Sequence, residues 1–400
     1  MTGNAAVEVA VVGGGPAGLT AAIALAAAGI ETALISKAPP ADNRTTALLS
    51  GSVAALEALE VWPLCREHAA PLIAIRLIDD TARLIRAPEV TFEAAEIGLE
   101  AFGHNIENRH LIRALDARAA ALPQLKRIDA AVEAVEPDDA GVTIRLDGGG
   151  NITARLVVGA DGRKSLCRAA AGIETEHRSY PQAALTLNLH HARPHNGIST
   201  EFHTESGPFT LVPLPGLRSS LVCVVDPAEA EQLRALGAQA LSAEIERRAH
   251  SILGKVAVEE RRGLFPLTTE TARSFGRTRI ALVGESAHVI PPIGAQGLNL
   301  GLRDAASIGE LVVEARRNGG DVGSTDLLAE YDRRRRADVT SRAFAVDALN
   351  RSLLSDFLPV QGARGFGLYL LDRIAPLRRA VMREGVEPAA QPRLMRGEAL

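Results

Sequence analysis

Three glycine-bearing segments, far apart along the chain, constrain the fold of this sequence more than any other feature. The first runs from Gly13 to Gly18, the second from Gly159 to Arg163, and the third from Gly284 to Asp304. The first follows a valine-rich run and precedes an alanine-rich stretch, which is the order strand, tight turn, helix. Glycines at such a turn let the backbone approach a pyrophosphate, and the N–H groups at the helix start face that anion. The sequence therefore predicts a phosphate-binding turn, with a chain that returns twice to the same extended ligand.

The spacing of apolar residues predicts a parallel sheet with helices on its faces. Strands are expected at 7–12 and 32–36 with a helix at 19–28 between them, which makes a βαβ unit. Between 183 and 225 short apolar runs alternate with turn signals, which predicts a mainly antiparallel sheet inserted into this fold. The other expected elements are a loop leading into a helix at 44–59, helices at 108–122, 298–317 and 326–354, and strands at 130–135, 142–146, 156–160 and 280–284.

The composition indicates a globular chain and excludes several classes of function. Of the 400 residues, 46% are hydrophobic, and the formal net charge of −4 gives no electrostatic footprint for nucleic acid. The three cysteines form no CxxC pair, so neither a disulfide framework nor a zinc site is expected, and a reducing cytoplasm is the simplest location. No signal peptide is expected, and no apolar run is long enough to span a bilayer.

Two clusters of polar side chains have a mainly structural interpretation. His190, His191 and His195 have a spacing that fits no standard metal site, so we expect a polar strand end and predict no metal. The run Arg333–Arg336 lies on an expected helix and is interpreted as a solvated face, with a membrane-surface or partner contact as the alternative. His288 is likewise expected to be structural rather than catalytic.

The end of the second expected strand lacks a residue that nucleotide-binding folds usually have. An acid there accepts the ribose hydroxyls, but this chain has Ser36 and Lys37. The adenosine end of the ligand must therefore be held differently. In an alternative interpretation Lys37 pairs with a 2′-phosphate, which would make the first segment an NADP site but leave the other two segments unexplained.

Taken together, these stretches resemble the class A flavoprotein monooxygenases. The residues that carry the resemblance are Gly13–Gly18, Asp42–Leu48, the Asp161–Gly162 pair and the late block Gly284–Gly301. Glu107–Leu111 and the leucine- and arginine-rich tail at 350–383 are also similar to the ubiquinone-biosynthesis hydroxylase branch of that family. The resemblance covers nearly the whole chain, and the late block is its most specific part.

The resemblance implies an α/β fold: a Rossmann-like FAD-binding domain, an inserted, mainly antiparallel β-sheet substrate domain, and a helical C-terminal region. The FAD-binding domain would be discontinuous and comprise residues 1–70, 100–180 and 275–345. The substrate domain would comprise 71–99 and 181–274, and the helical region 346–400.

The resemblance also implies which residues contact FAD. Glu285 stands where the family usually has the aspartate that binds the ribitol chain, so the contact should shift but keep an acceptor. The segment Pro292–Asn299 would pass along the flavin ring, where N–H groups at a helix start stabilise negative charge on the reduced flavin. Within it, Pro292 and Gly297 are the expected catalytic positions. The expected cofactor-binding residues are Gly13, Gly15, Ala17, Gly18, Ser36, Lys37, Arg44, Asn108, Asp161, Gly162, Glu285, Pro292, Gly294, Ala295, Gln296, Gly297, Leu298 and Asn299.

The implied reaction uses NAD(P)H and O2 as co-substrates. NAD(P)H reduces the FAD, the reduced flavin forms a C4a-hydroperoxide with O2, and its outer oxygen is transferred to the ring of a polyprenylated phenol. This hydrophobic aromatic substrate would contact apolar runs at 202–213, 221–225 and 264–267, although a plain hydrophobic core explains these runs equally well. Two alternatives stay open: a hydroxylase of a small soluble aromatic or flavin reductase, and a non-catalytic flavin-binding scaffold of a biosynthetic complex.

The tail of the chain forms a dense apolar region. It extends from Leu353 past Phe357 to Leu371 and is followed by the basic pair Arg378–Arg379. Such a region would line an entry route for a greasy substrate, contact a membrane surface or a biosynthetic complex, or form a homodimer. The expected location is therefore cytoplasmic or peripheral to the inner membrane.

Overall fold

The structure, a computed structural model, describes residues 5–37, 42, 44–83, 86–354, 358–386, 388 and 390–400, so that Phe357 lies outside the described residues. Its first large sheet has the strand order β17-β18-β11-β1-β2-β8, with the antiparallel strands β10 and β9 attached to β11. The neighbours β18, β11, β1, β2 and β8 run parallel to one another. The strands are β1 (Ala5–Val12), β2 (Thr32–Ile35), β8 (Leu125–Ile128), β9 (Val132–Pro137), β10 (Val142–Leu146), β11 (Asn151–Gly159), β17 (Gly276–Arg277) and β18 (Ile280–Leu282).

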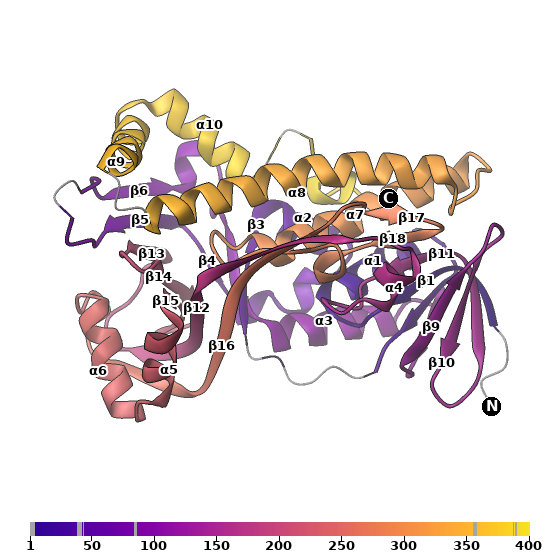
Figure 1. Cartoon of the computed structure of the whole chain (residues 1–400), viewed down its shortest axis with the longest axis horizontal. Coiled ribbons are helices and arrows are strands. Elements are labelled where there is room, and N and C mark those ends of the chain that lie inside the picture. The colour runs from indigo at the N-terminus through magenta and orange to yellow at the C-terminus, as the bar shows by residue number, and fades with distance from the viewer. Residues whose placement is uncertain are drawn as a thin grey trace.

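Helices pack tightly around this parallel sheet. Helix α1 is alanine-rich, and its buried residues from Gly18 to Ala26 allow close contact with both α3 and α7. Helix α7 packs in turn against α8, which runs along most of the length of the molecule (Figure 1). The helices of this half are α1 (Pro16–Ala27), α2 (Ser50–Ala58), α3 (Asn108–Ala120), α4 (Leu166–Ala170), α7 (Gln296–Arg317) and α8 (Thr325–Leu354).

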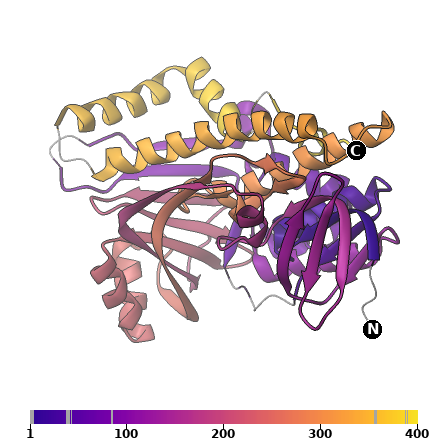
Figure 2. The same cartoon turned by 45° about the vertical axis from the view of Figure 1, so that its right-hand side comes forward.

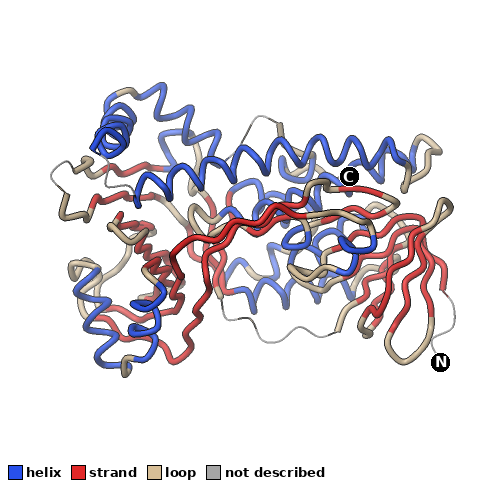
Figure 3. Tube along the Cα trace, in the orientation of Figure 1, coloured by secondary structure: helices blue, strands red, loops and turns tan. Residues whose placement is uncertain are grey.

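The second large sheet is mainly antiparallel and has the order β19-β16-β12-β15-β14-β13-β5-β6. Its longest strands, β12 and β16, form the pair of long strands that reaches from this sheet toward the parallel sheet (Figure 3). Helices α5 (Pro227–Ala235) and α6 (Ala238–Arg248) pack against it (Figure 2). The strands are β5 (Ala74–Asp79), β6 (Val90–Glu93), β12 (Thr175–His191), β13 (Ile198–His203), β14 (Pro208–Leu214), β15 (Arg218–Val225), β16 (Val256–Ala272) and β19 (His288–Val289).

A small sheet and the C-terminal helices complete the structure. The small sheet has the order β3-β7-β4, from β3 (Thr45–Leu49), β7 (Gly103–Glu107) and β4 (Ala69–Pro71). After α9 (Leu358–Arg373) and α10 (Ala375–Val386), the last residues return to pack on α2 and α7. The short 3-10 helices are η1 (Trp62–Leu64), η2 (Arg66–His68), η3 (Ala94–Ile97), η4 (Gly284–Ser286) and η5 (Arg393–Arg396).

The architecture confirms the α/β fold class and most of the expected elements, with one clear difference. Residues 45–49, expected to form a loop, are strand β3, and they pair with Gly103–Glu107 of β7. Because a strand acquires its hydrogen bonds from a partner more than fifty residues away in this chain, local sequence did not reveal it. The expected helix at 298–317 begins slightly earlier, at Gln296.

Candidate functional site

The three glycine-bearing segments meet at one edge of the parallel sheet. In the register of the sheet, Val12 of β1 lies beside Gly159 of β11, and Gly159 lies beside Leu282 of β18. The first segment begins directly after β1, the second begins at the last residue of β11, and the third begins two residues after the end of β18. Because parallel strands present their carboxyl ends at the same edge, the segments lie side by side where α/β folds bind nucleotides.

Two glycines of the first segment are required by close backbone packing. Gly13 has a φ of +116°, and a Cβ atom built on it would lie 2.2 Å from the carbonyl oxygen of Ala160. A Cβ on Gly18 would lie 2.1 Å from the carbonyl oxygen of Gly13. Only glycine fits at either position, so the first and second segments are in direct contact.

Ala17 joins the first segment to the third. Cβ atoms built on Gly284 and on Gly301 would each lie 3.2 Å from the Cβ atom of Ala17. The side chain of Ala17 therefore packs between α1 and the start of α7. Its expected contact with the cofactor stays a prediction.

The start of α1 is open toward a ligand. Its N-cap residue, Gly15, makes no side-chain hydrogen bond to the helix, so the first N–H groups have no side-chain cap. A Cβ on Gly15 would meet no atom within 4 Å, which leaves free space in front of these donors. Together, uncapped N–H groups and free space are what a pyrophosphate needs.

Arg44 and Asn108 are held by one carboxylate. Asp42 accepts hydrogen bonds from Nε and Nη2 of Arg44, at 2.9 and 2.8 Å, and from Nδ2 of Asn108 at 2.8 Å. Burial raises the pKa of Asp42, but the hydrogen bonds from Arg44 and Asn108 outweigh it and lower the pKa below its usual value. A guanidinium has five N–H donors, so Arg44 keeps donors for an anionic ligand. It also lies 5.9 Å from the ring centroid of Phe265, which belongs to the antiparallel sheet.

The second segment is shaped by Asp161. Its carboxylate accepts a hydrogen bond from the Ser165 hydroxyl at 2.5 Å and from the Cys167 N–H at 3.1 Å, so it fixes the start of α4. Gly162, with a φ of +80°, has open space where a side chain would stand. Arg163 donates to Glu285 across 3.3 Å, and both side chains are about half exposed, which leaves Glu285 accessible as an acceptor.

The turn before α7 has an unusual backbone. Gly294 and Ala295 both have positive φ values, +67° and +55°, and Ala295 is the N-cap of α7 without a side-chain cap. A left-handed conformation at a non-glycine residue is a mark of local strain, which concentrates at functional sites. Pro292 on this turn and Gly297 at the start of α7 are both exposed.

The side chain of Asn299 connects this turn to β3 and α2 by hydrogen bonds. Its Oδ1 accepts hydrogen bonds from the Leu49 N–H at 2.9 Å and the Ser52 hydroxyl at 2.7 Å, and its Nδ2 donates to the carbonyls of Ala47 and Ala295 at 2.8 and 2.6 Å. The side chain is thus fully used within the protein. Its role, if the turn contacts a ligand, is to position the backbone.

Gln296 and Leu298, near Asn299 on α7, make different kinds of contact with the protein. Gln296 donates to the Gly294 carbonyl at 2.9 Å and accepts from Arg342 at 3.3 Å, whereas Leu298 is half-buried and packs against the main core. Both side chains thus contact the protein, and their expected cofactor contacts stay predictions.

Ser36 and Lys37 have separate surroundings. Ser36 lies against the first turn, since a Cβ on Gly14 would come within 2.5 Å of its Oγ. Lys37 forms an ion pair with Asp147, in the turn between β10 and β11.

A buried network of charges behind the third segment was not expected from the sequence. Asp304 on α7 accepts hydrogen bonds from the His288 ring at 2.7 Å, the Gly284 N–H at 2.9 Å and Nε of Arg335 at 2.6 Å. Arg335 also donates to Asp338 at 2.8 Å. This network fixes η4 and α7 relative to each other, and it assigns His288 the structural role that was expected.

The prediction that Arg333–Arg336 form a solvated face is therefore wrong for one residue. Arg333 and Arg336 are exposed and pair with Glu330 and Asp332, but Arg335 is only 3% exposed. Residue type cannot show which of four consecutive arginines points inward. Helical spacing could have shown it, because Arg335 lies four residues from both Tyr331 and Val339, which are buried.

The two faces of the antiparallel sheet have different neighbours. One face packs with α5 and α6 into a single apolar cluster, so the hydrophobic-core interpretation holds for alternate residues of 202–213 and 221–225. The other face carries a separate small cluster of Ala184, Val224 and Leu267. Phe265, 37% exposed and near Arg44, points to the same region as the flavin-binding candidates.

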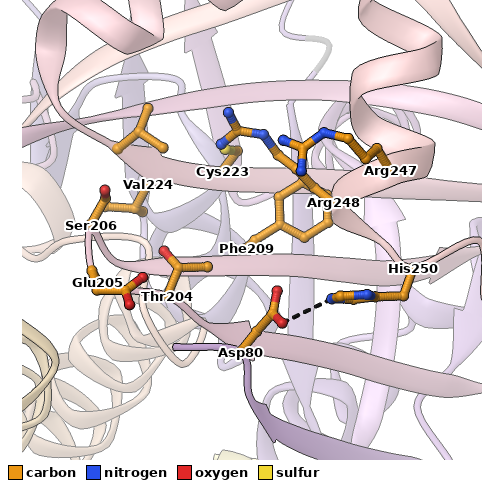
Figure 4. Close-up of a pocket in the computed structure, with 11 residues that line it drawn as sticks. Asp80, Thr204, Glu205, Ser206, Phe209, Cys223, Val224, Arg247, Arg248 and His250 are labelled. Atoms are coloured by element: carbon orange, nitrogen blue, oxygen red, sulfur yellow. Dashed lines mark hydrogen bonds and ion pairs between the residues drawn. The ribbon is translucent and has the colours of Figure 1, made fainter. Parts of the chain in front are cut away.

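A cavity of about 290 Å³ lies on the α6 side of this sheet (Figure 4). Its lining includes Phe209 and Val225 from two of the runs expected to contact substrate, but none of the expected cofactor-binding residues. Its charged groups already pair: the His250 ring lies 2.9 Å from Asp80, and Arg248 bonds to Glu229 and Glu244. Burial raises the pKa of Cys223 to about 11, so its thiol is unreactive at neutral pH. We assign this cavity no function.

The histidine cluster is structural. The two ring nitrogens of His191 lie 2.8 Å from the Arg193 carbonyl and 3.1 Å from the Ser219 hydroxyl, and His195 bonds to the Leu214 carbonyl at 2.9 Å. Within the described ranges, no group of three or more His, Cys, Asp or Glu side chains could hold a metal ion. Nor does any described helix combine the length and apolar character that crossing a membrane requires.

The parallel sheet, its glycine turn and the two segments that return to it define a dinucleotide-binding flavoprotein. A family profile described as FAD binding domain matches residues 6–344. Ubiquinone hydroxylase UbiL of Rhodospirillum rubrum is 37% identical over 417 residues, covering 100% of this chain and 95% of the relative. The 3-demethoxyubiquinol 3-hydroxylase of Escherichia coli K12 is 31% identical over 391 residues, covering 95% of this chain and 98% of the relative.

Solved structures agree with this assignment at the level of the fold. The p-nitrophenol 4-monooxygenase PnpA from Pseudomonas putida DLL-E4 matches with a TM-score of 0.78 and 20% identity, covering 96% of this chain and 100% of that one. The chain belongs to the family of FAD-dependent aromatic monooxygenases that includes the ubiquinone hydroxylases.

Proposed function

We propose that this protein hydroxylates the aromatic ring of a polyprenylated phenol in ubiquinone biosynthesis, with FAD as cofactor and NAD(P)H and O2 as co-substrates. The observation that carries the proposal is the full-length similarity to two hydroxylases named for that pathway. The three glycine-bearing segments support it, because they meet at one edge of the parallel sheet and each could contact a different part of an extended dinucleotide.

The chain's own residues fit FAD in several places. The uncapped start of α1 and the free space at Gly15 suit the pyrophosphate, and Arg44 has donors left for the same phosphates. Glu285 is accessible for hydroxyls of the ribitol chain. When bound there, FAD would supply the redox chemistry of the reaction, namely hydride acceptance and O2 activation.

The start of α7 is suited to the flavin ring. Its N–H groups have no side-chain cap, and its dipole places partial positive charge at Ala295 and Gln296. This end would stabilise negative charge on a reduced cofactor, typically by about 0.3–1 kcal/mol per charge at an exposed helix end. Pro292 and Gly297 would shape this contact, and Asn299 would hold it in position.

The substrate would lie between this turn and the exposed part of the antiparallel sheet. Phe265, which is 37% exposed, would offer an apolar contact for an aromatic ring. The buried cluster around Leu267 would support this face of the sheet and keep water from it. NAD(P)H would act transiently at the same site, because the sequence contains one glycine-rich dinucleotide turn of this kind.

A C-terminal apolar surface would bind the protein to the membrane that holds its hydrophobic substrate. We define it as the exposed side chains Phe344, Phe366, Tyr369, Ile374, Leu377 and Val381 of α8–α10 and the link between α9 and α10. Exposed arginines, among them Arg373 and Arg379, lie nearby in sequence. Apolar side chains with basic neighbours suit the surface of an anionic membrane, so we propose a cytoplasmic protein that binds the inner membrane peripherally.

Complementation tests the proposed reaction. Strains that each lack one ring-hydroxylation step of ubiquinone synthesis would receive this gene, and their quinone intermediates would be identified by mass spectrometry. Restoration of one step is the expected result. Robust turnover of small soluble phenols by the purified protein, without restoration of any step, would instead support a hydroxylase of soluble aromatics.

A further inference from the structure

A second cavity, of about 260 Å³, opens beside the first glycine turn, where the sequence lacks the usual ribose-binding acid. Its walls include Gly14 and Ser36 from the turn and the end of β2, together with Ile128 and Asp129 from the end of β8. Leu34 adds an apolar wall. The cavity therefore combines apolar surface, backbone of the phosphate-binding turn and two carboxylates, those of Asp116 and Asp129.

The pairing of β2 with β8 explains how Asp129 reaches this place. The two strands are parallel, with Ile35 beside Ile128 in the register. The N–H of Ser36 donates to the Ile128 carbonyl at 3.1 Å. Asp129 is thus the residue beside Ser36 on the neighbouring strand, one strand spacing of about 4.8 Å away, where it would take the place of an acid at the end of β2.

The charges around the cavity single out Asp129 as the available acceptor. The other acid in the wall, Asp116, is bonded to Arg127 at 2.7 Å. Lys37 is engaged with Asp147. Asp129 is exposed and has no hydrogen bond to the described part of the chain, so its carboxylate can accept two hydroxyl donors from a ligand.

We propose that Asp129 accepts hydrogen bonds from the 2′- and 3′-hydroxyls of the adenosine ribose of FAD and so replaces the acid missing after β2. The inference rests on the proposed binding of FAD. A free carboxylate in this cavity repels a 2′-phosphate, and both nearby cations are already paired. The arrangement therefore disfavours the alternative in which Lys37 makes the first segment an NADP site.

Binding of FAD analogues tests this assignment without measuring catalysis. Flavin-free full-length protein would be titrated with FAD and with analogues lacking the 2′- or the 3′-hydroxyl of the adenosine ribose, and flavin fluorescence would report the dissociation constants. For the wild-type protein we expect FAD to bind about ten-fold more tightly than at least one analogue, as lost charge-assisted hydrogen bonds predict. In Asp129→Asn this discrimination should fall to about two-fold or less, because the charge is gone.

Asp116→Asn is the matched control, since it changes an acid of the same cavity that is already paired. It should keep the discrimination of the wild-type protein. The inference is overturned if the wild-type protein binds FAD and both analogues equally, or if Asp129→Asn retains the ten-fold difference. If no flavin binds to any variant, the proposed function itself fails, which is a different outcome.

Discussion

Arg335 of α8 donates a hydrogen bond from Nε to the carboxylate of Asp304 on α7 at 2.6 Å, and both side chains are almost completely buried. The same carboxylate holds His288 and the N–H of Gly284. A buried ion pair is thus placed directly behind the segment expected to bind the flavin. Its function is to fix η4 and α7, because removal of either partner would leave an unpaired charge in the core.

Replacing Arg335 should therefore be costly. We expect Arg335→Met to lower the free energy of unfolding by about 3–5 kcal/mol, the range for breaking a buried pair. Arg336→Met is the control, because Arg336 is exposed and pairs with half-buried Asp332. Its cost should be about 0–1 kcal/mol. Denaturant unfolding of both variants provides the comparison, and similar losses would contradict a special role for Arg335.

Acid should weaken the same network. Burial opposes ionisation of Asp338, but the charges of Arg335 and Arg303 outweigh it and hold its pKa well below the usual value. A carboxyl with a depressed pKa in the folded state stabilises the protein above its unfolded pKa of about 4, and this stabilisation is lost as the pH falls further.

The measurement is the free energy of unfolding between pH 7 and pH 3. The wild-type protein should lose stability below about pH 4.5, and Asp338→Asn should show a smaller loss over the same interval, from a lower starting value. A slope unchanged by the substitution would show that Asp338 does not contribute to acid sensitivity.

Two glycines of the first turn should respond differently to the same substitution. Gly18→Ala places a Cβ 2.1 Å from a backbone oxygen and should destabilise the flavin-free protein by about 1–3 kcal/mol. Gly15→Ala meets only free space in the protein and has a φ of −72°, so the flavin-free protein should keep its stability. Its FAD affinity should nevertheless fall at least about ten-fold, because the methyl group occupies the space in front of the helix N–H groups. Thermal unfolding and flavin titration together check both variants; retained FAD affinity in Gly15→Ala would place the pyrophosphate elsewhere.

Arg44 should be sensitive even to a conservative change. Lysine cannot bond to Asp42 through two nitrogens and also donate to a phosphate, because it lacks the guanidinium fork. We expect Arg44→Lys to weaken FAD binding about ten-fold or more. Arg109→Lys is the control, because Arg109 forms a neighbouring ion pair with Glu107. It should change the FAD affinity by about two-fold or less. Equal effects of the two substitutions would argue against a phosphate contact of Arg44.

The C-terminal apolar surface should govern binding to lipid and leave flavin binding intact. Phe366→Ser combined with Tyr369→Ser removes two of its exposed side chains. Co-sedimentation with vesicles containing anionic lipid should fall several-fold, while bound FAD per chain stays unchanged. If the variant instead shifts from dimer to monomer by light scattering and the wild-type protein ignores vesicles, the surface is a homodimer interface.

Local sequence predicted part of the site and missed the rest. The phosphate-binding turn, helix α1 and the later helices follow from residues near one another in the chain, and the structure places them within a few residues of the expected bounds. The role of Asn299 was beyond such reasoning. It was expected to contact FAD, which stays a prediction, but its side chain also bonds extensively to the protein, and its partners Ala47, Leu49 and Ser52 lie far from it in the chain.

Sequence alone determined that this chain folds as a parallel α/β sheet with a dinucleotide turn and a second, antiparallel sheet. Glycine spacing and apolar periodicity act over a few residues, so they are visible without a structure. Tertiary structure alone decided that Arg335 pairs with Asp304 in the core, that residues 45–49 form a strand, and that Asp129 stands beside Ser36. Each depends on packing between elements distant in the chain, and neither residue type nor local spacing encodes which distant partner a side chain will meet.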